Sequence, residues 1–220
     1  MVFLIQTKKA DSIQEDELRK GACHVMKILL AGDSTVAHYG PEAKPMSGWG
    51  EGLEFALQES GSDVRVLNFA KPGASTKTFR DEGLWNDLLN EIDDQDLVII
   101  QFGHNDQKVD SGVQAKDFYL NLKRMIHDVI EKNGCPSLCT PVERRNIVGE
   151  SFKKSLNQER HLMKKLAQQE QVYLIDLNDY SYFIYQSSTS IEQTKEYVCW
   201  FDAGQEENYP EGIEDNTHLS

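Results

Sequence analysis

The stretch DLVIIQFG, residues 96–103, decides the fold class of this chain. Four apolar residues, 97–100, follow each other without a polar interruption, and a glycine ends the run at Gly103. A short continuous apolar run bounded by turn residues is typical of a strand that is buried on both faces. Strands of this kind lie in parallel sheets covered by helices, so the stretch predicts the centre of an α/β protein.

Similar runs lie on both sides of this stretch and alternate with helical patterns. Further strands are predicted at 27–32 (KILLAG), 64–70 (VRVLNFA), 136–141 (PSLCTP) and 172–177 (VYLIDL). Apolar spacing typical of helices occurs at 48–60, 81–92, 115–134 and 151–171. Alternation of strands and helices predicts a three-layer α/β domain with a parallel sheet and helices on both faces.

The length of the chain indicates how many domains it forms, and its charge limits the kinds of molecule that it can bind. The 220 residues suit one domain with a sizeable core. The net charge is −13, and no basic block occurs, so the surface repels phosphate backbones and anionic lipids. No apolar run approaches the roughly 20 residues that span a bilayer. We therefore expect neither nucleic acid nor a membrane as partner, while the oligomeric state stays open.

The first 25 residues are expected to be a non-native or flexible extension. Met26 stands directly before the first predicted strand, which makes it a candidate for the native start of a domain over 26–220. The opening run MVFLI is too short for a signal peptide, and acidic residues follow it. A cytoplasmic location is the expectation, and the alternative for residues 1–25 is a genuine but dispensable arm.

The cysteines suggest neither a disulfide nor a metal site. Cys135 and Cys139 share a predicted strand, and four residues of strand separate them by roughly 13 Å, beyond disulfide reach. No Cys/His cluster has zinc spacing. We expect reduced thiols, no metal and no cofactor.

Polar residues follow each of the first four predicted strands: GDST, AKPGAST, GHND and TPVERR, in that order. Ligands of parallel α/β sheets bind outside the carboxyl ends of the strands. Because these four segments meet at one edge of the sheet, we expect the functional site there.

Ser34 and the pair Asp215 and His218 are the candidate catalytic residues. A serine directly after a strand, in a tight turn, can present its hydroxyl to a cleft, although capping of a helix is an equally good reading of Ser34 alone. A serine needs a base, and the base needs an orienting group. Asp215 lies three residues before His218, a spacing that places both on one side of a turn. Read alone, the ending DNTHLS is more often a polar tail.

Acyl transfer also needs hydrogen-bond donors for the developing oxyanion. The backbone N–H groups of Ser34 and Gly73 and the side-chain amide of Asn105 follow the first three strands and are candidates. The alternatives are a plain turn glycine for Gly73 and a turn-capping residue for Asn105.

The blocks GDST, NFAKPGAST, FGHND and DNTHL resemble, in the same order, those of the SGNH (GDSL-type) serine hydrolases. With GWG, TPVERR and IDLN added, the sequence is similar to the rhamnogalacturonan acetylesterase branch, over residues 27–220. The resemblance implies a flavodoxin-like sheet of five parallel strands and an ester hydrolysis that needs no metal.

Carried over onto this chain, the resemblance makes Ser34 the nucleophile, His218 the base and Asp215 its orienter. The oxyanion hole is formed by Ser34, Gly73 and Asn105.

Other residues are expected to shape the loops and the substrate cleft. Those that support the loops are Asp33, His104 and Asp106. Those that are candidates to line a sugar cleft are Trp49, Arg144, Arg145 and Trp200, for which packing is an equally good reading.

The implied function is removal of O-acetyl groups from pectic, rhamnogalacturonan-type oligosaccharides in a bacterial cytoplasm. The alternatives are a lipase or thioesterase of the same superfamily and a non-catalytic carbohydrate-binding protein with the same fold. Family members usually continue past the catalytic histidine with a helix, whereas this sequence stops at Ser220. We therefore expect the domain to lack that helix and its activity to be impaired.

Overall fold

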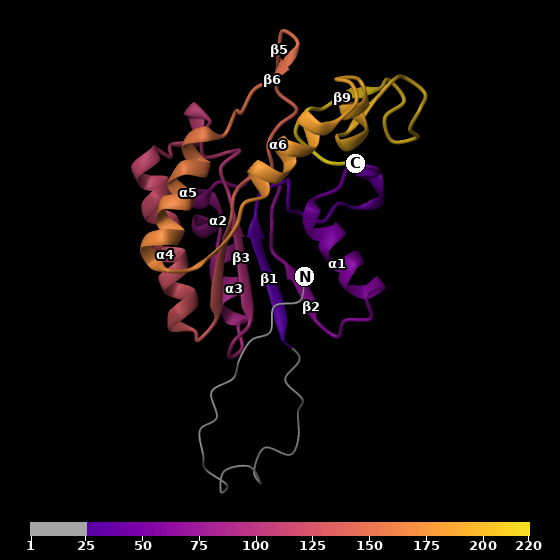
Figure 1. Ribbon diagram of the computed structural model, residues 1–220. Coiled ribbons are helices and arrows are strands. Elements are labelled where there is room, and N and C mark those ends of the chain that lie inside the picture. Colours follow the sequence, from indigo (N-terminus) through magenta and orange to yellow (C-terminus); the bar gives the residue numbers. More distant parts are fainter. Residues whose placement is uncertain (1–25) are drawn as a thin grey trace, which may run out of the picture.

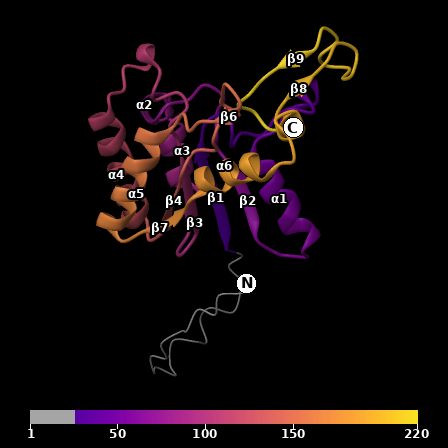
Figure 2. The same cartoon turned by 45° about the horizontal axis from the view of Figure 1, so that its top comes forward.

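The computed structural model describes residues 26–220, so the extension predicted at 1–25 lies outside the described residues. Five parallel strands form the central sheet in the order β2-β1-β3-β4-β7 (Figures 1 and 2). Their bounds are β1 Lys27–Gly32, β2 Arg65–Asn68, β3 Leu97–Gln101, β4 Cys135–Cys139 and β7 Tyr173–Ile175. The predicted fold class is confirmed, with the flavodoxin-like strand order.

The larger core lies on one face of the sheet. Side chains alternate between the two faces of a strand, and Leu29, Val98 and Ile100 point into this core. The helices that contribute buried side chains to it are α2 (Thr76–Asp81), α3 (Leu84–Asn90), α4 (Ala115–Glu131) and α5 (Asn157–Glu170). These four helices therefore cover one face.

A smaller core lies on the opposite face. Ile28, Leu30 and Ile99 point into it, and α1 (Trp49–Glu59) and α6 (Leu177–Ser187) pack over it (Figure 1). The two faces of β1 and β3 are thus both covered, which explains why their sequences are continuously apolar.

Two predicted helices have different bounds, and two helices were missed. The helix predicted at 81–92 corresponds to α3, which begins only at Leu84, after Gly83 with φ of +88°. The missed helix α2 lies before that glycine and begins at a capping box of Ser75 and Thr78. The helix predicted at 151–171 begins only at Asn157; a small hairpin, β5 (Ile147–Val148) with β6 (Ser151–Phe152), comes first. No helix was predicted over α6, which starts from an Asp176 side-chain cap.

The last part of the chain lies above the carboxyl ends of the strands. After α6 come a short helical turn, η3 (Gln193–Tyr197), and a hairpin of β8 (Trp200–Phe201) and β9 (Ile213–Glu214). Figures 1 and 2 both show this hairpin beyond the upper ends of the strands, on the side where the C-terminus lies. Residues 215–220 therefore end near the edge of the sheet predicted to hold the site. Within the described residues, no helix has the length and apolar character needed to cross a membrane.

The start of α1 packs against the turn that follows β1, and this contact requires a glycine at Gly50. A Cβ there would meet the Val36 carbonyl oxygen and lie 2.5 Å from Asn68 Nδ2, whereas a Cβ at Gly52, in the same helix, would meet nothing within 4 Å. We predict that Gly50→Ala lowers the free energy of unfolding by about 1–3 kcal/mol through overpacking. Gly52→Ala should raise it by about 0.5–1 kcal/mol. Urea unfolding of both variants measures the difference, and equal effects would contradict this packing.

Candidate active site

Ser34 lies in a tight turn directly after β1. The N–H groups of Val36 and Ala37 both donate to the Asp33 carbonyl, at 3.1 Å each, and this closes the turn. No helix begins at this point, since the N-cap of the next short helix is Gly40 and that of α1 is Gly48. The reading of Ser34 as a helix cap is therefore wrong, and its side chain is free to make other contacts.

Ser34, His218 and Asp215 form a continuous hydrogen-bonded chain. His218 Nε2 lies 2.8 Å from Ser34 Oγ, and His218 Nδ1 lies 2.6 Å from Asp215 Oδ2. A carboxylate can only accept, so Nδ1 carries the proton in this contact and Nε2 is left to accept from the serine hydroxyl. The arrangement can remove a proton from Ser34 and hold it on the imidazole.

The carboxylate of Asp215 is held in its charged form. Burial raises its pKa, but hydrogen bonds from the His218 ring and from the backbone N–H groups of His218 and Thr217 outweigh it, so the pKa lies below its ordinary value. Asp215 thus stays ionised at neutral pH and able to orient the imidazole.

Backbone hydrogen bonds attach the last residues to the rest of the domain. The N–H of Cys199 donates to the His218 carbonyl at 2.9 Å, and the N–H of Asp215 donates to the Cys199 carbonyl at 3.1 Å. The N–H of Ser47 donates to the Leu219 carbonyl at 2.9 Å. His218 is therefore fixed on both sides, by the β8–β9 hairpin and by the segment before α1.

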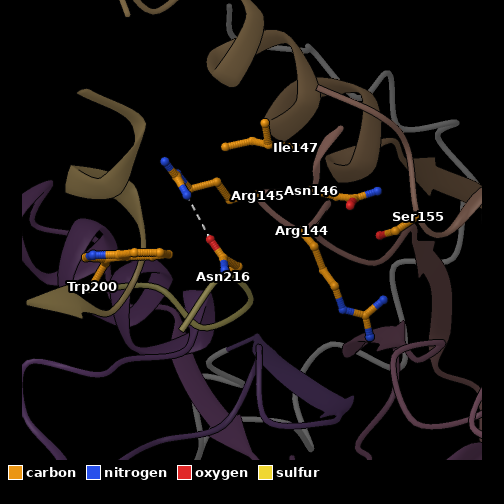
Figure 3. A pocket seen from close by; sticks show the side chains of 7 residues that line it. All are labelled: Arg144, Arg145, Asn146, Ile147, Ser155, Trp200 and Asn216. Carbon is orange, nitrogen blue, oxygen red and sulfur yellow. Dashed lines mark hydrogen bonds between the residues drawn. The ribbon is translucent and has the colours of Figure 1, made fainter. Parts of the chain in front are cut away.

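Arg145 is a second attachment of the same turn. Its backbone N–H donates to the Asn216 carbonyl at 2.8 Å, and its Nη1 donates to Asn216 Oδ1 at 2.9 Å (Figure 3). Its other nitrogens donate to Thr194 Oγ1 and the Ile191 carbonyl, and the guanidinium lies 4.9 Å from the centre of the Trp200 ring. Only 6% of Arg145 is exposed. Arg145 thus holds the residue next to Asp215.

The expected oxyanion donors have free hydrogens. Among the described residues, the N–H groups of Ser34 and Gly73 donate to no acceptor. Gly73 lies in a turn with φ of +82°, a backbone angle that residues with a side chain rarely adopt. Asn105 Nδ2 uses one hydrogen on the Ala74 carbonyl at 2.9 Å, which leaves its second hydrogen available, and Lys108 fixes its oxygen.

A buried network joins the ends of β1, β3 and β4 beneath these groups. Asp33 Oδ1 accepts from Thr35, and His104 bridges Asp33 Oδ2, at 3.3 Å, and the Val142 carbonyl, at 2.9 Å. Burial raises the pKa of Asp33, but the charge and hydrogen bond of His104 and the bonds from Thr35 bring it below its ordinary value. The network fixes the backbone on which Ser34 and Asn105 stand.

The four predicted cleft residues have partners within the fold. Trp49 Nε1 donates to Gln101 Oε1 at 2.8 Å, and Trp200 has the cations of Arg145 and Lys195 over its ring. Arg144 is half-buried and donates to the His104 carbonyl. The four do not form one surface, since Trp49 packs on the smaller core while the other three lie around a separate cavity.

Tyr39 is a site residue that the sequence did not single out. Its hydroxyl donates to the Ser34 carbonyl at 3.0 Å, and its ring meets the His218 ring edge-on with centroids 6.4 Å apart. Burial raises its pKa to about 12, so the hydroxyl stays protonated. A single tyrosine in a loop has no distinctive sequence signal, which is why the contact could be found only from the structure.

No group of three His, Cys, Asp or Glu side chains in residues 26–220 is arranged to hold a metal ion. Over the same range Cys135, Cys139 and Cys199 are free thiols.

Asp106 carries a buried oxygen that its neighbours do not satisfy. Oδ1 accepts from the N–H and hydroxyl of Thr76, whereas Oδ2 has no partner among the described residues, and the residue is 3% exposed. Burial raises the pKa of Asp106 to about 6, above the ordinary value of 3.8. The folded protein therefore binds this proton more tightly than the unfolded chain, and stability falls as pH rises from about 4 through 6.

We predict that Asp106→Asn removes this pH dependence. The amide oxygen still accepts from Thr76, and the amide cannot ionise. The free energy of unfolding of the variant, relative to that of the wild type, should therefore rise by up to about 3 kcal/mol between pH 4 and pH 8. Urea unfolding at both pH values gives the gap in free energy of unfolding between the two proteins. The contributions of other titrating groups are the same in both proteins and cancel in this gap. A gap that does not change with pH would show that Asp106 titrates normally.

The family model described as the GDSL-like Lipase/Acylhydrolase family matches residues 30–220. The rhamnogalacturonan acetylesterase RhgT of Bacillus subtilis (strain 168) is 36% identical over 196 residues, which are 89% of this chain and 83% of that protein. The probable rhamnogalacturonan acetylesterase YesY of the same organism is 33% identical over 197 residues, 88% of this chain and 84% of that protein.

Solved structures have the same fold. The crystal structure of YxiM from Bacillus subtilis aligns with a TM-score of 0.75 and 28% identity, over 89% of this chain but only 51% of that one. A variant of the acetylxylan esterase Axe2 from Geobacillus stearothermophilus aligns with a TM-score of 0.64 and 15% identity, over 89% of this chain and 87% of that one, which shows the fold alone. This chain belongs to the GDSL-like lipase/acylhydrolase family and is an ester-hydrolysing enzyme of the SGNH type.

Proposed function

We propose that the enzyme removes acetyl groups from pectic, rhamnogalacturonan-type oligosaccharides through an acyl-enzyme formed on Ser34. The observation that carries the mechanism is the chain of contacts from Ser34 Oγ through His218 to Asp215, with 2.8 Å and 2.6 Å between its members. Each contact has the length of a good hydrogen bond, so the base lies within reach of the proton it must take.

In the first half of the reaction, His218 Nε2 takes the Ser34 proton as Oγ attacks the acetyl carbonyl carbon. The negative charge that develops on the carbonyl oxygen accepts from the N–H groups of Ser34 and Gly73 and the free amide hydrogen of Asn105. The ester bond then breaks, the sugar oxygen takes the proton from His218, and the acetyl group stays on Ser34.

In the second half, water replaces the sugar. His218 removes a proton from the water as it attacks the acetyl carbonyl, and the same donors stabilise the second oxyanion. Acetate leaves as Ser34 Oγ recovers its proton from His218. Asp215 stays ionised throughout and stabilises the imidazolium form of His218 in both halves.

The substrate class is supported by two similar proteins, whose names describe rhamnogalacturonan acetylesterases and which match over most of this chain. The chemistry at the site agrees with a short acyl group on a polar alcohol. The loops around Ser34 carry polar and charged side chains, including Asn105, Arg144 and Asn216. A lipase or thioesterase would need an apolar channel for its acyl chain.

We predict that the enzyme releases acetate from acetylated rhamnogalacturonan fragments and that Ser34→Ala lowers kcat/KM at least about a thousandfold, because no nucleophile remains. Acetate release from acetylated pectin, xylan and chitin fragments measures both the activity and its preference. Ser187→Ala, at an exposed serine on the end of α6, is the matched control and should keep full activity.

Two outcomes would contradict the proposal separately. Undiminished turnover by Ser34→Ala would exclude the serine mechanism. Faster cleavage of octanoyl than of acetyl esters would exclude a sugar acetylesterase in favour of a lipase-type enzyme.

A further inference from the structure

Arg144 is a half-buried cation at the active site with no anionic partner. Among the described residues, no carboxylate oxygen lies within 4.0 Å of its guanidinium, although the chain holds 36 acidic residues. Its contacts are neutral: Nη2 lies 3.4 Å from the His104 carbonyl, and both Nη atoms face the Gln107 amide, whose oxygen accepts from them once it is turned toward Arg144. The remaining N–H groups have no acceptor among these residues.

Of the four carboxylates nearest to Arg144, Glu159 is buried and forms no ion pair with the guanidinium, and burial raises its pKa, which favours its neutral form. The other three are already committed to other groups. Asp33 is bonded to Thr35 and His104, and Asp215 to His218. Glu143 accepts from Ser155 and from the Arg144 backbone.

Burial lowers the pKa of the Arg144 guanidinium, while the charges of Glu143, Asp33, Glu159 and Asp215 act against this from a distance. A half-buried charge with neutral contacts is costly for the free protein, and a bound anion would offset that cost.

The position of Arg144 is next to the reacting groups. The carbonyl that it contacts belongs to His104, the residue before Asn105. Arg144 also lines a cavity of about 350 Å³ together with Asn146, Ser155 and Asn216, and Asn216 follows Asp215 directly (Figure 3). Figure 3 shows the Arg144 side chain pointing away from Trp200, whereas Arg145 contacts both Trp200 and Asn216. A sugar beside the acetylated one would lie within reach of Arg144 and of these amide and hydroxyl groups.

We propose that Arg144 binds the carboxylate of a uronate residue in the acetylated oligosaccharide. The proposal rests on the function proposed above and adds that Arg144 is the residue that recognises the charge of such a substrate. A guanidinium matches a planar carboxylate with two parallel N–H groups. Arg145 is not available for this role, because its side chain donates to Thr194, Asn216 and Ile191. The two Nη atoms of Arg144 face the exposed amide of Gln107, whose place a carboxylate would take.

The net charge of the protein is −13, which makes a positive group such as Arg144 important for binding an anionic sugar. The general field of the protein repels an anionic oligosaccharide, so a local positive group must position it at the site. Arg144 thereby acts on substrate choice, and its contribution depends on the charge of the sugar.

The test compares two substrates that differ only in that charge: an acetylated galacturonate-containing oligosaccharide and the same compound with its carboxyl groups methyl-esterified. The measured quantity is the ratio of kcat/KM for the free acid to kcat/KM for the methyl ester. We expect a ratio well above 1 in the wild type and a fall of about tenfold to a hundredfold in Arg144→Gln, since a hydrogen bond to a charged group is lost. Arg144→Lys should keep part of the preference.

Arg65→Gln is the matched control, because this exposed arginine stands at the opposite end of the sheet, at the start of β2. It should leave the ratio unchanged. Binding of an unacetylated oligogalacturonate to Ser34→Ala, measured by calorimetry, gives a second readout that needs no turnover, and Arg144→Gln in that background should weaken it by a similar factor.

The possible failures are distinct. If both substrates lose activity equally in Arg144→Gln, the cation acts on the reaction and not on the sugar, and the inference is wrong. If the wild type prefers the methyl ester or a neutral acetylated xylan fragment, the inference is wrong while a sugar acetylesterase remains. Loss of all acetate release with oligogalacturonate binding intact would contradict the proposed function alone.

Discussion

The structure depends on one set of contacts, which hold the turn of Asp215 and His218 against the carboxyl end of β1. Ser34 and His218 are separated by 184 positions in the chain, yet their side chains meet at 2.8 Å. Hydrogen bonds from Cys199 and Ser47 to the carbonyls of His218 and Leu219 fix the backbone, and Arg145 fixes Asn216 through two more.

Beneath this turn, the ends of the strands are joined by polar groups that are almost fully buried. Asp33 and His104 link β1, β3 and the segment after β4, and Gln101 of β3 links Thr35 to Trp49. Such a network is stabilising only when its members are satisfied, and here nearly all are. Asp106 is an exception, and its raised pKa reflects the burial of its carboxylate, one oxygen of which has no partner.

The fold could be predicted from the sequence because β1 and β3 are apolar on both faces, and only a parallel sheet with two helical layers explains this. The residues proposed to react could be named from the sequence because each stands at a strand end or in the DNTHLS ending, within blocks of distinctive sequence. The contacts that hold them could not. The ring contact of Tyr39 with His218 and the bond of Arg145 to Asn216 have no local pattern, since the partners are far apart in sequence. The separation of α2 from α3 depends on the φ of one glycine, Gly83, and only α3 had been predicted, as the helix at 81–92.

We infer that Arg145 and the hairpin hold the Asp215–His218 turn at the distance from Ser34 that proton transfer needs. The most direct test is kcat for an acetyl ester in Arg145→Met, which keeps an unbranched stem and loses the side-chain bonds to Asn216, Thr194 and Ile191. We predict a folded protein in which kcat falls about tenfold to a hundredfold, with KM for a neutral aryl acetate unchanged, because a base displaced by about 1 Å loses rate on that order. A folded variant with wild-type kcat would contradict it.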